Sequence, residues 1–198
     1  MAQAALQVAA YRVLGHTFVG TYESTSARQF LHGRTETTRA LSPSMVAMVK
    51  ALHDKECSAE EKRQRIEEAT IAHTAYSRNA SQGKGVDRHF FGLSMLVQEG
   101  ESMPDLVEDP VFLRSKRWLL STSHVPSMSP GFGPVDPEGL GIGYDVRAHD
   151  MTFTVSGWKS TGRVEAMKDG IAQALCDLAE IVRQAPRSAP HRSSRRTR

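Results

Sequence analysis

Three consecutive residues with hydroxyl side chains, Ser121, Thr122 and Ser123, directly follow the apolar segment Trp118-Leu119-Leu120. The apolar half is typical of a buried strand, but a hydroxyl in an apolar setting costs free energy unless it is hydrogen-bonded. We therefore expect either a buried polar site with partners for these hydroxyls, or a strand end that turns toward solvent.

A second polar group is the sequence Asp87-Arg88-His89. The guanidinium of Arg88 offers a charged fork of donors that suits a carboxylate. A surface ion pair between Arg88 and its neighbour Asp87 is the alternative.

Metal and disulfide chemistry have little support. Cys57 and Cys176 are the only cysteines, too few for a disulfide framework or a CxxC metal site. His73 lies at helical spacing from apolar residues, where a lone histidine is more often a satisfied core residue than a ligand. We predict no metal site.

Helices should position these residues. Ser42 followed by Pro43 marks one helix start, and Ser58 with Glu61 forms a capping box at another. The first helix has no capping residue before it, as if the chain were entered partway through a domain. Apolar spacing predicts helices over 1–15, from 42, from 58, and over 86–97 and 164–182.

Strands are expected between these helices. β-branched and aromatic content predicts two strands within 18–30 and 31–42, and a third at 118–123. Alternating apolar residues predict a hairpin within 139–158. The order αββαααβββα indicates an α/β (α+β) fold, a mixed β-sheet covered by helices.

Three glycines, Gly139, Gly141 and Gly143, alternate with the apolar residues of the hairpin. Their smooth face allows another element or a ligand to approach closely, and a curved or bulged strand would explain them equally well.

Charge is concentrated at the C-terminus. Residues 184–198 hold five arginines and no acid, and removing them from the formal net charge of +3 leaves −2 for the rest. A nearly neutral body argues against nucleic-acid binding, and a tail rich in Ser, Pro and Arg is expected to be disordered. No window reaches the ~20 apolar residues of a transmembrane span.

Four motifs together resemble the carnitine/choline acyltransferase family: Tyr22-Glu23-Ser24, Gly33-Arg34-Thr35-Glu36-Thr37, Asp87-Arg88-His89, and Ser121-Thr122-Ser123 followed by GFGPVDPEGLGIGY. The resemblance covers about residues 4–183, as the C-terminal half of such an enzyme. It implies a half-domain similar to chloramphenicol acetyltransferase, incomplete at its N-terminus, with residues 184–198 as a tail.

The resemblance implies roles for these residues in acyl transfer between CoA and carnitine. Tyr22, Thr35 and Arg88 would bind the carnitine carboxylate, with Ser24 as a further substrate-binding hydroxyl. Ser123 would donate toward the oxyanion and the substrate, while Ser121 and Thr122 orient the strand and the carboxylate.

The resemblance also implies that Phe132 faces the trimethylammonium group of carnitine, where cation–π attraction is worth ~0.5–2 kcal/mol. Core packing of Phe132 is the alternative. Carnitine is favoured over choline because the choline branch replaces Arg88 and Thr35. Acyl-chain length stays open.

The sequence offers no recognisable general base for the carnitine hydroxyl. None of the eight histidines lies in the family's catalytic context, and no His-x-x-x-Asp sequence occurs. We therefore expect an acyltransferase half that needs the N-terminal half of the enzyme as its partner and is inactive alone. A non-catalytic remnant or a truncated gene model is the alternative. Relatives occur in mitochondria and peroxisomes, and the chain does not end in a peroxisomal tripeptide.

Overall fold

The fold was obtained as a computed structural model, which describes residues 1–127 and 131–185. Of the expected C-terminal tail, residues 186–198 lie outside the described ranges. The elements are α1 (Ala2–Val13), β1 (Thr21–Ser26), β2 (Thr35–Arg39), α2 (Pro43–His53), α3 (Ala59–Ser81), α4 (Asp87–Met95), α5 (Asp105–Glu108), α6 (Pro110–Ser115), β3 (Leu120–His124), β4 (Leu140–Val146), β5 (Met151–Gly157), a 3₁₀ turn η1 (Lys159–Thr161) and α7 (Val164–Gln184).

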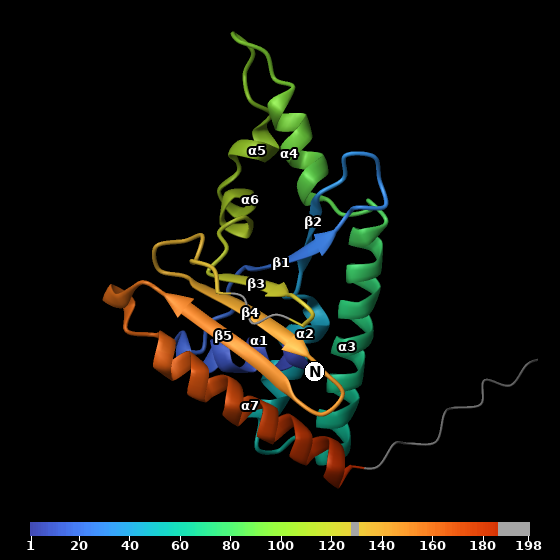
Figure 1. The fold of residues 1–198 in the computed structure, drawn as a ribbon, viewed down its shortest axis with the longest axis vertical. Coiled ribbons are helices and arrows are strands. Elements are labelled where there is room, and N and C mark those ends of the chain that lie inside the picture. The colour runs from blue at the N-terminus through green and yellow to red at the C-terminus, as the bar shows by residue number, and fades with distance from the viewer. Residues whose placement is uncertain (128–130, 186–198) are drawn as a thin grey trace, which may run out of the picture.

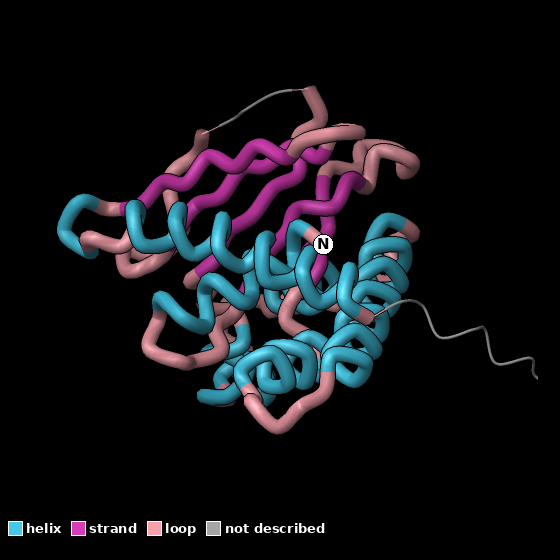
Figure 2. Tube along the Cα trace, turned by 90° about the horizontal axis from the view of Figure 1, so that it is seen from below, coloured by secondary structure: helices cyan, strands magenta, loops and turns pink. Residues whose placement is uncertain are grey.

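The strands form one mixed five-stranded sheet in the order β2-β1-β3-β4-β5. The inner pairs β1–β3 and β3–β4 are parallel, and the outer pairs β1–β2 and β4–β5 are antiparallel. The predicted α/β class with a mixed sheet is therefore confirmed. Figure 2 shows the main helices gathered on one side of this sheet.

Helix α1 lies at the centre of the helical layer, and its residues from Ala2 to Ala10 are all buried. Small side chains let α7 approach it closely, since a Cβ added at Gly170 would lie 3.4 Å from the Cβ of Ala9. The core beneath the sheet is apolar, and each fully buried aliphatic side chain contributes ~1.5–3 kcal/mol. Its largest fully buried members include Leu6, Met45, Met48, Leu120, Leu140, Ile142, Met167 and Leu178.

The predicted helix starts are confirmed by their caps. Ser42 accepts a hydrogen bond from the Met45 amide with Pro43 in the first turn, and Ser58 accepts one from the Glu61 amide. The prediction of three helices between the second and third strands was incomplete, because α5 and α6 also lie there. These helices have four and six residues, too few to show an apolar period.

The expected strands are present: β1 and β2 lie within their predicted ranges, and β3 begins two residues later and ends one residue later than predicted. β4 and β5 pair continuously from Leu140 opposite Gly157 to Val146 opposite Met151, without a bulge. Of the two explanations for the glycines of β4, a bulged strand is therefore wrong.

Helices α4, α5 and α6 form an arm that extends away from the sheet, in the upper part of the molecule in Figure 1. Several apolar side chains on this arm are exposed, among them Phe91, Met95, Leu96 and Val111. Within the described ranges, no helix combines the length and the apolar character needed to cross a membrane.

Candidate functional site

The two faces of the sheet differ in chemistry because side chains alternate along each strand. Glu23, Thr122 and Tyr144 point to the helical layer, where they contact one another or residues of α1 and α3. Their strand neighbours therefore point the other way. We call that side the hydroxyl face; it carries Tyr22, Ser24, Thr37, Ser121, Ser123, Thr154 and Ser156.

The first two hydroxyls after Leu120 are buried, with Ser121 5% exposed and Thr122 1% exposed, and Ser123 is half-buried. The Thr122 hydroxyl donates to the Tyr22 carbonyl oxygen at 2.8 Å, and the Ser123 hydroxyl lies 3.1 Å from the Ser24 hydroxyl. A strand end that turns to solvent is therefore the wrong explanation for this motif.

Arg88 and Thr35 are brought together at the outer end of the hydroxyl face. The Arg88 Nε donates to the Thr35 carbonyl oxygen at 2.9 Å, and its Nη2 lies 3.4 Å from the Thr35 hydroxyl oxygen. The side chain is exposed, and the Nη1 group has no hydrogen-bond partner in residues 1–127 or 131–185. This guanidinium can therefore bind an anionic oxygen from outside the chain.

The start of α4, which carries Arg88, is fixed by Glu36. The buried Glu36 carboxylate accepts hydrogen bonds from the Arg88 amide at 3.3 and 3.4 Å. A carboxylate is favourable at a helix N-terminus because amide protons and the helix dipole point toward it. Gly85 lets the chain pass this close, since a Cβ there would clash with the Glu36 side chain.

Asp87 does not pair with Arg88. Its carboxylate accepts two hydrogen bonds from the guanidinium of Arg39, at 2.9 and 2.7 Å. Arg39 also lies over the ring of Trp118, 4.7 Å from its centroid. The alternative explanation for Arg88, an ion pair with its neighbour, is therefore wrong.

Phe132 lies beside the glycines of β4. Its carbonyl oxygen accepts a hydrogen bond from the Ser156 hydroxyl, and a Cβ added at Gly141 would lie 2.5 Å from that oxygen. The glycine face thus serves the close approach of another segment. Phe132 is half-buried and lies outside the hydrophobic core, so core packing does not explain it.

The structure describes seven of the eight histidines, and none of the seven hydrogen bonds to Ser123. His73 forms the most buried histidine–carboxylate pair, with its Nε2 3.5 Å from Glu23 Oε2. This pair lies on the helical side of the sheet, opposite the hydroxyl face. Burial lowers the pKa of His73, and the Glu23 charge opposes that shift.

The described residues thus bring two pairs of predicted site residues into contact, Ser24 with Ser123 and Thr35 with Arg88. Tyr22 lies opposite Ser121 in the β1–β3 ladder. Among residues 1–127 and 131–185, no hydrogen bond joins Arg88 to Tyr22, and no group of three or more His, Cys, Asp or Glu side chains could hold a metal.

Sequence reasoning missed the buried polar residues that join α1 to the sheet. Gln3 and Gln7 are both buried, and each donates from α1 to a threonine of the sheet. The sequence did contain a signal for this role, because Gln3 and Gln7 are spaced four residues apart on an apolar helix face. The pairing of Arg39 with Asp87 had no comparable local signal, because 48 residues separate them.

Comparison with known proteins identifies the family of this chain. The family model described as Choline/Carnitine o-acyltransferase matches residues 1–173. The chain is 36% identical over 192 residues to carnitine O-acetyltransferase of Columba livia, covering 94% of this chain and 30% of that protein. It is 36% identical over 207 residues to choline O-acetyltransferase of Mus musculus, with coverage of 99% and 32%.

A third relative is peroxisomal carnitine O-octanoyltransferase of Rattus norvegicus, 35% identical over 191 residues, with coverage of 92% of this chain and 31% of that protein. The chain thus spans about 30% of the length of these relatives. Since the family model covers most of the chain, the protein belongs to the choline/carnitine O-acyltransferase family.

Proposed function

We propose that this chain supplies the carnitine-binding and oxyanion-stabilising part of a carnitine O-acyltransferase. Such an enzyme transfers an acyl group reversibly between CoA and carnitine, with acyl-CoA as co-substrate. Residues 1–183 would form the C-terminal half of the catalytic domain, and the remainder of the enzyme, as in the longer relatives, would be its partner.

The observation that carries the proposal is the arrangement of Arg88. Its guanidinium is anchored on Thr35 through Nε and Nη2, while α4 is capped by Glu36. Anchoring fixes the direction of the remaining donors, and a fixed guanidinium binds a carboxylate with good geometry. Carnitine has a carboxylate and choline has none, so this arrangement favours carnitine.

The hydroxyl face supports the second part of the proposal. Ser24 and Ser123 share one hydrogen bond but have two hydroxyl protons, so one proton stays free to donate to a ligand oxygen. Ser123 would donate to the oxyanion, with Tyr22, Ser24 and Ser121 as substrate-binding hydroxyls on the same face. Loss of one oxyanion donor typically lowers the rate by ~10²–10³.

Phe132 would contact the trimethylammonium group. Its segment is held against the sheet by the Ser156 hydrogen bond and by the close approach to Gly141. An aromatic ring outside the core suits a cation–π contact with a quaternary amine, which cannot be satisfied by hydrogen bonds.

A general base must lie within hydrogen-bond reach of the carnitine hydroxyl. The Glu23–His73 pair lies on the far side of the sheet, and no described histidine hydrogen bonds to Ser123. We propose that the base comes from the remainder of the enzyme. The same observation favours the second candidate, a non-catalytic chain that binds carnitine without transferring an acyl group.

Isothermal titration of the 198-residue chain with carnitine and with choline tests the carnitine assignment. Replacing Arg88 by Asn should weaken carnitine binding strongly, because loss of a charged hydrogen bond at a binding site costs ~2–5 kcal/mol. Choline binding should change far less, because choline brings no carboxylate to be left unpaired.

The control variant is Arg65→Asn, which removes an arginine that pairs with glutamates along the surface of α3. It should leave both ligands unaffected. Equal losses of carnitine and choline binding in Arg88→Asn would contradict the assignment, as would a wild-type chain that binds neither ligand.

A further inference from the structure

Two buried glutamines of α1 connect the helix to the sheet in different ways. Gln3 and Gln7 are 4% and 3% exposed, and their Nε2 groups donate at 3.0 Å to Thr122 and Thr21, respectively. Thr21 hydrogen bonds onward to the carbonyl of Val19, in the segment that leads into its own strand. The Gln7 contact therefore does not join two strands.

The Gln3 contact does join two strands. The Thr122 hydroxyl has one proton, which it donates to the Tyr22 carbonyl on the neighbouring strand β1. It must therefore accept from Gln3, so the hydrogen bonds run in one direction from Gln3 through Thr122 to Tyr22. This chain of bonds lies directly behind Ser121 and Ser123, on the opposite side of the sheet.

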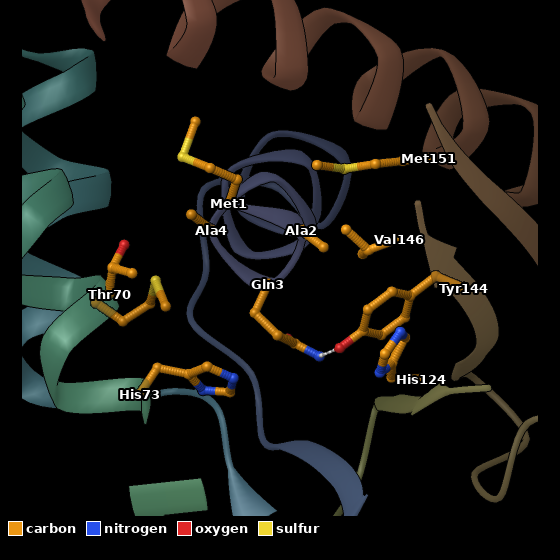
Figure 3. A pocket seen from close by; sticks show the side chains of 11 residues that line it. Met1, Ala2, Gln3, Ala4, Thr70, His73, His124, Tyr144, Val146 and Met151 are labelled. Atoms are coloured by element: carbon orange, nitrogen blue, oxygen red, sulfur yellow. Dashed lines mark hydrogen bonds between the residues drawn. The ribbon is translucent and has the colours of Figure 1, made fainter. Parts of the chain in front are cut away.

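A second branch leads from Gln3 to β4. The Gln3 Nε2 lies 3.4 Å from the Tyr144 hydroxyl, which donates to the Glu23 carboxylate. Figure 3 shows the Gln3 side chain extending from α1 between His73 and Tyr144, with its amide at the Tyr144 hydroxyl. Gln3 thus contacts β3 and β4 and, through Thr122 and Tyr144, reaches β1.

The amide of Gln3 is held at a cost. Thr122 and Tyr144 both donate elsewhere, so both need the amide nitrogen, and the buried Gln3 Oε1 has no partner among the described residues. An unsatisfied buried acceptor costs about 1–3 kcal/mol, which an apolar residue at this position would avoid. Stability alone is therefore a poor reason for a glutamine here.

We infer that Gln3 is a positioning residue for the hydroxyl face. By fixing Thr122 against the Tyr22 carbonyl, it sets how β1 and β3 lie beside each other. That relation determines the Ser24–Ser123 separation of 3.1 Å and the place of the Tyr22 side chain. The part of this inference that concerns ligand binding rests on the proposed carnitine site.

Gln7 provides a matched control, one helical turn away. Gln3→Leu removes the hydrogen bonds to Thr122 and Tyr144 together with the unpaired Gln3 Oε1, whereas Gln7→Leu removes an amide that is paired with Thr21. Gln3→Leu should therefore lower the melting temperature no more than Gln7→Leu does. In calorimetric titration of the 198-residue chain, Gln3→Leu should weaken carnitine binding about tenfold or more, whereas Gln7→Leu should leave it within about twofold. Equal affinities for the two variants would overturn the inference.

Thr122→Val offers an independent route if Gln3→Leu does not fold. It removes the same connection from the other side and should weaken carnitine binding to a similar extent. If both single variants fold, the double variant should lose little more than either one, because the residues act through one contact. Additive losses would show that Gln3 acts by another route.

Amide hydrogen exchange on the ligand-free chain separates this inference from the proposed function. Gln3→Leu should speed the exchange of the ladder amides between Thr21–Glu23 and Leu120–Thr122 about tenfold more than Gln7→Leu does. Failure of the wild type to bind carnitine would reject the proposed function. The exchange rates would still test whether Gln3 positions β1 against β3. Equal exchange in the two variants would reject the positioning role.

Discussion

The hydroxyl oxygens of Ser24 and Ser123 lie 3.1 Å apart, although 99 residues separate them in the chain. They meet because β1 and β3 are parallel neighbours and both side chains point to the hydroxyl face. The contact joins two of the predicted site motifs directly. No described histidine hydrogen bonds to either serine.

We predict that the purified chain shows no acyl transfer from acyl-CoA to carnitine, because we propose that the base for the carnitine hydroxyl comes from the remainder of the enzyme. A thiol-release assay measures this, with a full-length carnitine acyltransferase as the positive control. Carnitine-dependent release of CoA would contradict the prediction. Its loss on a single His→Ala change would then identify the base.

A second prediction concerns the segment that carries Phe132. Replacing Gly141 by Ala would place a Cβ 2.5 Å from the Phe132 carbonyl oxygen and 2.7 Å from the Ser156 hydroxyl. The segment must move away, so we expect a loss of about 1–3 kcal/mol in unfolding free energy. Carnitine binding should weaken as well, because Phe132 moves with its backbone.

Gly133→Ala is the control, since a Cβ at that position would meet no atom within 4 Å. Its unfolding free energy and carnitine affinity should stay close to those of the wild type. Urea denaturation and calorimetric titration measure both quantities. A Gly141→Ala variant as stable as Gly133→Ala would show that the two segments do not pack as described.

A third prediction concerns the arm formed by α4, α5 and α6. Met95 and Leu96 are 68% and 74% exposed there, and exposed apolar side chains in one region favour association. Replacing both by Gln should reduce self-association and binding of a hydrophobic dye. Analytical ultracentrifugation measures the association at equal protein concentrations.

Ile71→Gln is the control for this arm, because Ile71 is 69% exposed but lies on α3. It should change association little. A wild-type chain that stays monomeric, binds no dye and unfolds cooperatively at high temperature would contradict this prediction.

The elements predicted well from sequence were those with a local signal. The helices α2 and α3 have serine caps, and the buried positions Met167, Ile171 and Leu178 of α7 follow the helical period. The short helices α5 and α6 have no such period. Their starts are marked instead by prolines, Pro104 and Pro110, which are also common in loops.

The sequence predicted which residue types form the candidate site, but it did not predict every pair of residues that the fold brings into contact. Arg88 and Thr35 were expected together, and the structure joins them. One alternative paired Asp87 with Arg88 because the two are adjacent in the sequence. In the structure, the fold brings Arg39 to Asp87 instead. Two residues adjacent in a helix do not face each other, so adjacency was a weak guide.

The last prediction is a dependence of stability on pH through His73. Burial is the main cause that lowers its pKa below the model-peptide value of 6.5, so the folded state favours the neutral ring. As pH falls below about 6.5, the unfolded chain binds a proton at this residue more readily than the folded chain does. Unfolding free energy should therefore fall on acidification, by at most about 1.4 kcal/mol per pH unit for this one group.

Urea denaturation between pH 7 and pH 5 measures this dependence. His73→Asn should reduce the slope, because the asparagine cannot take up the proton. Glu23 opposes the shift in His73, so Glu23→Gln should steepen the slope by removing the charge that favours the protonated ring. Identical slopes in wild type and His73→Asn would show that His73 is not held neutral in the fold.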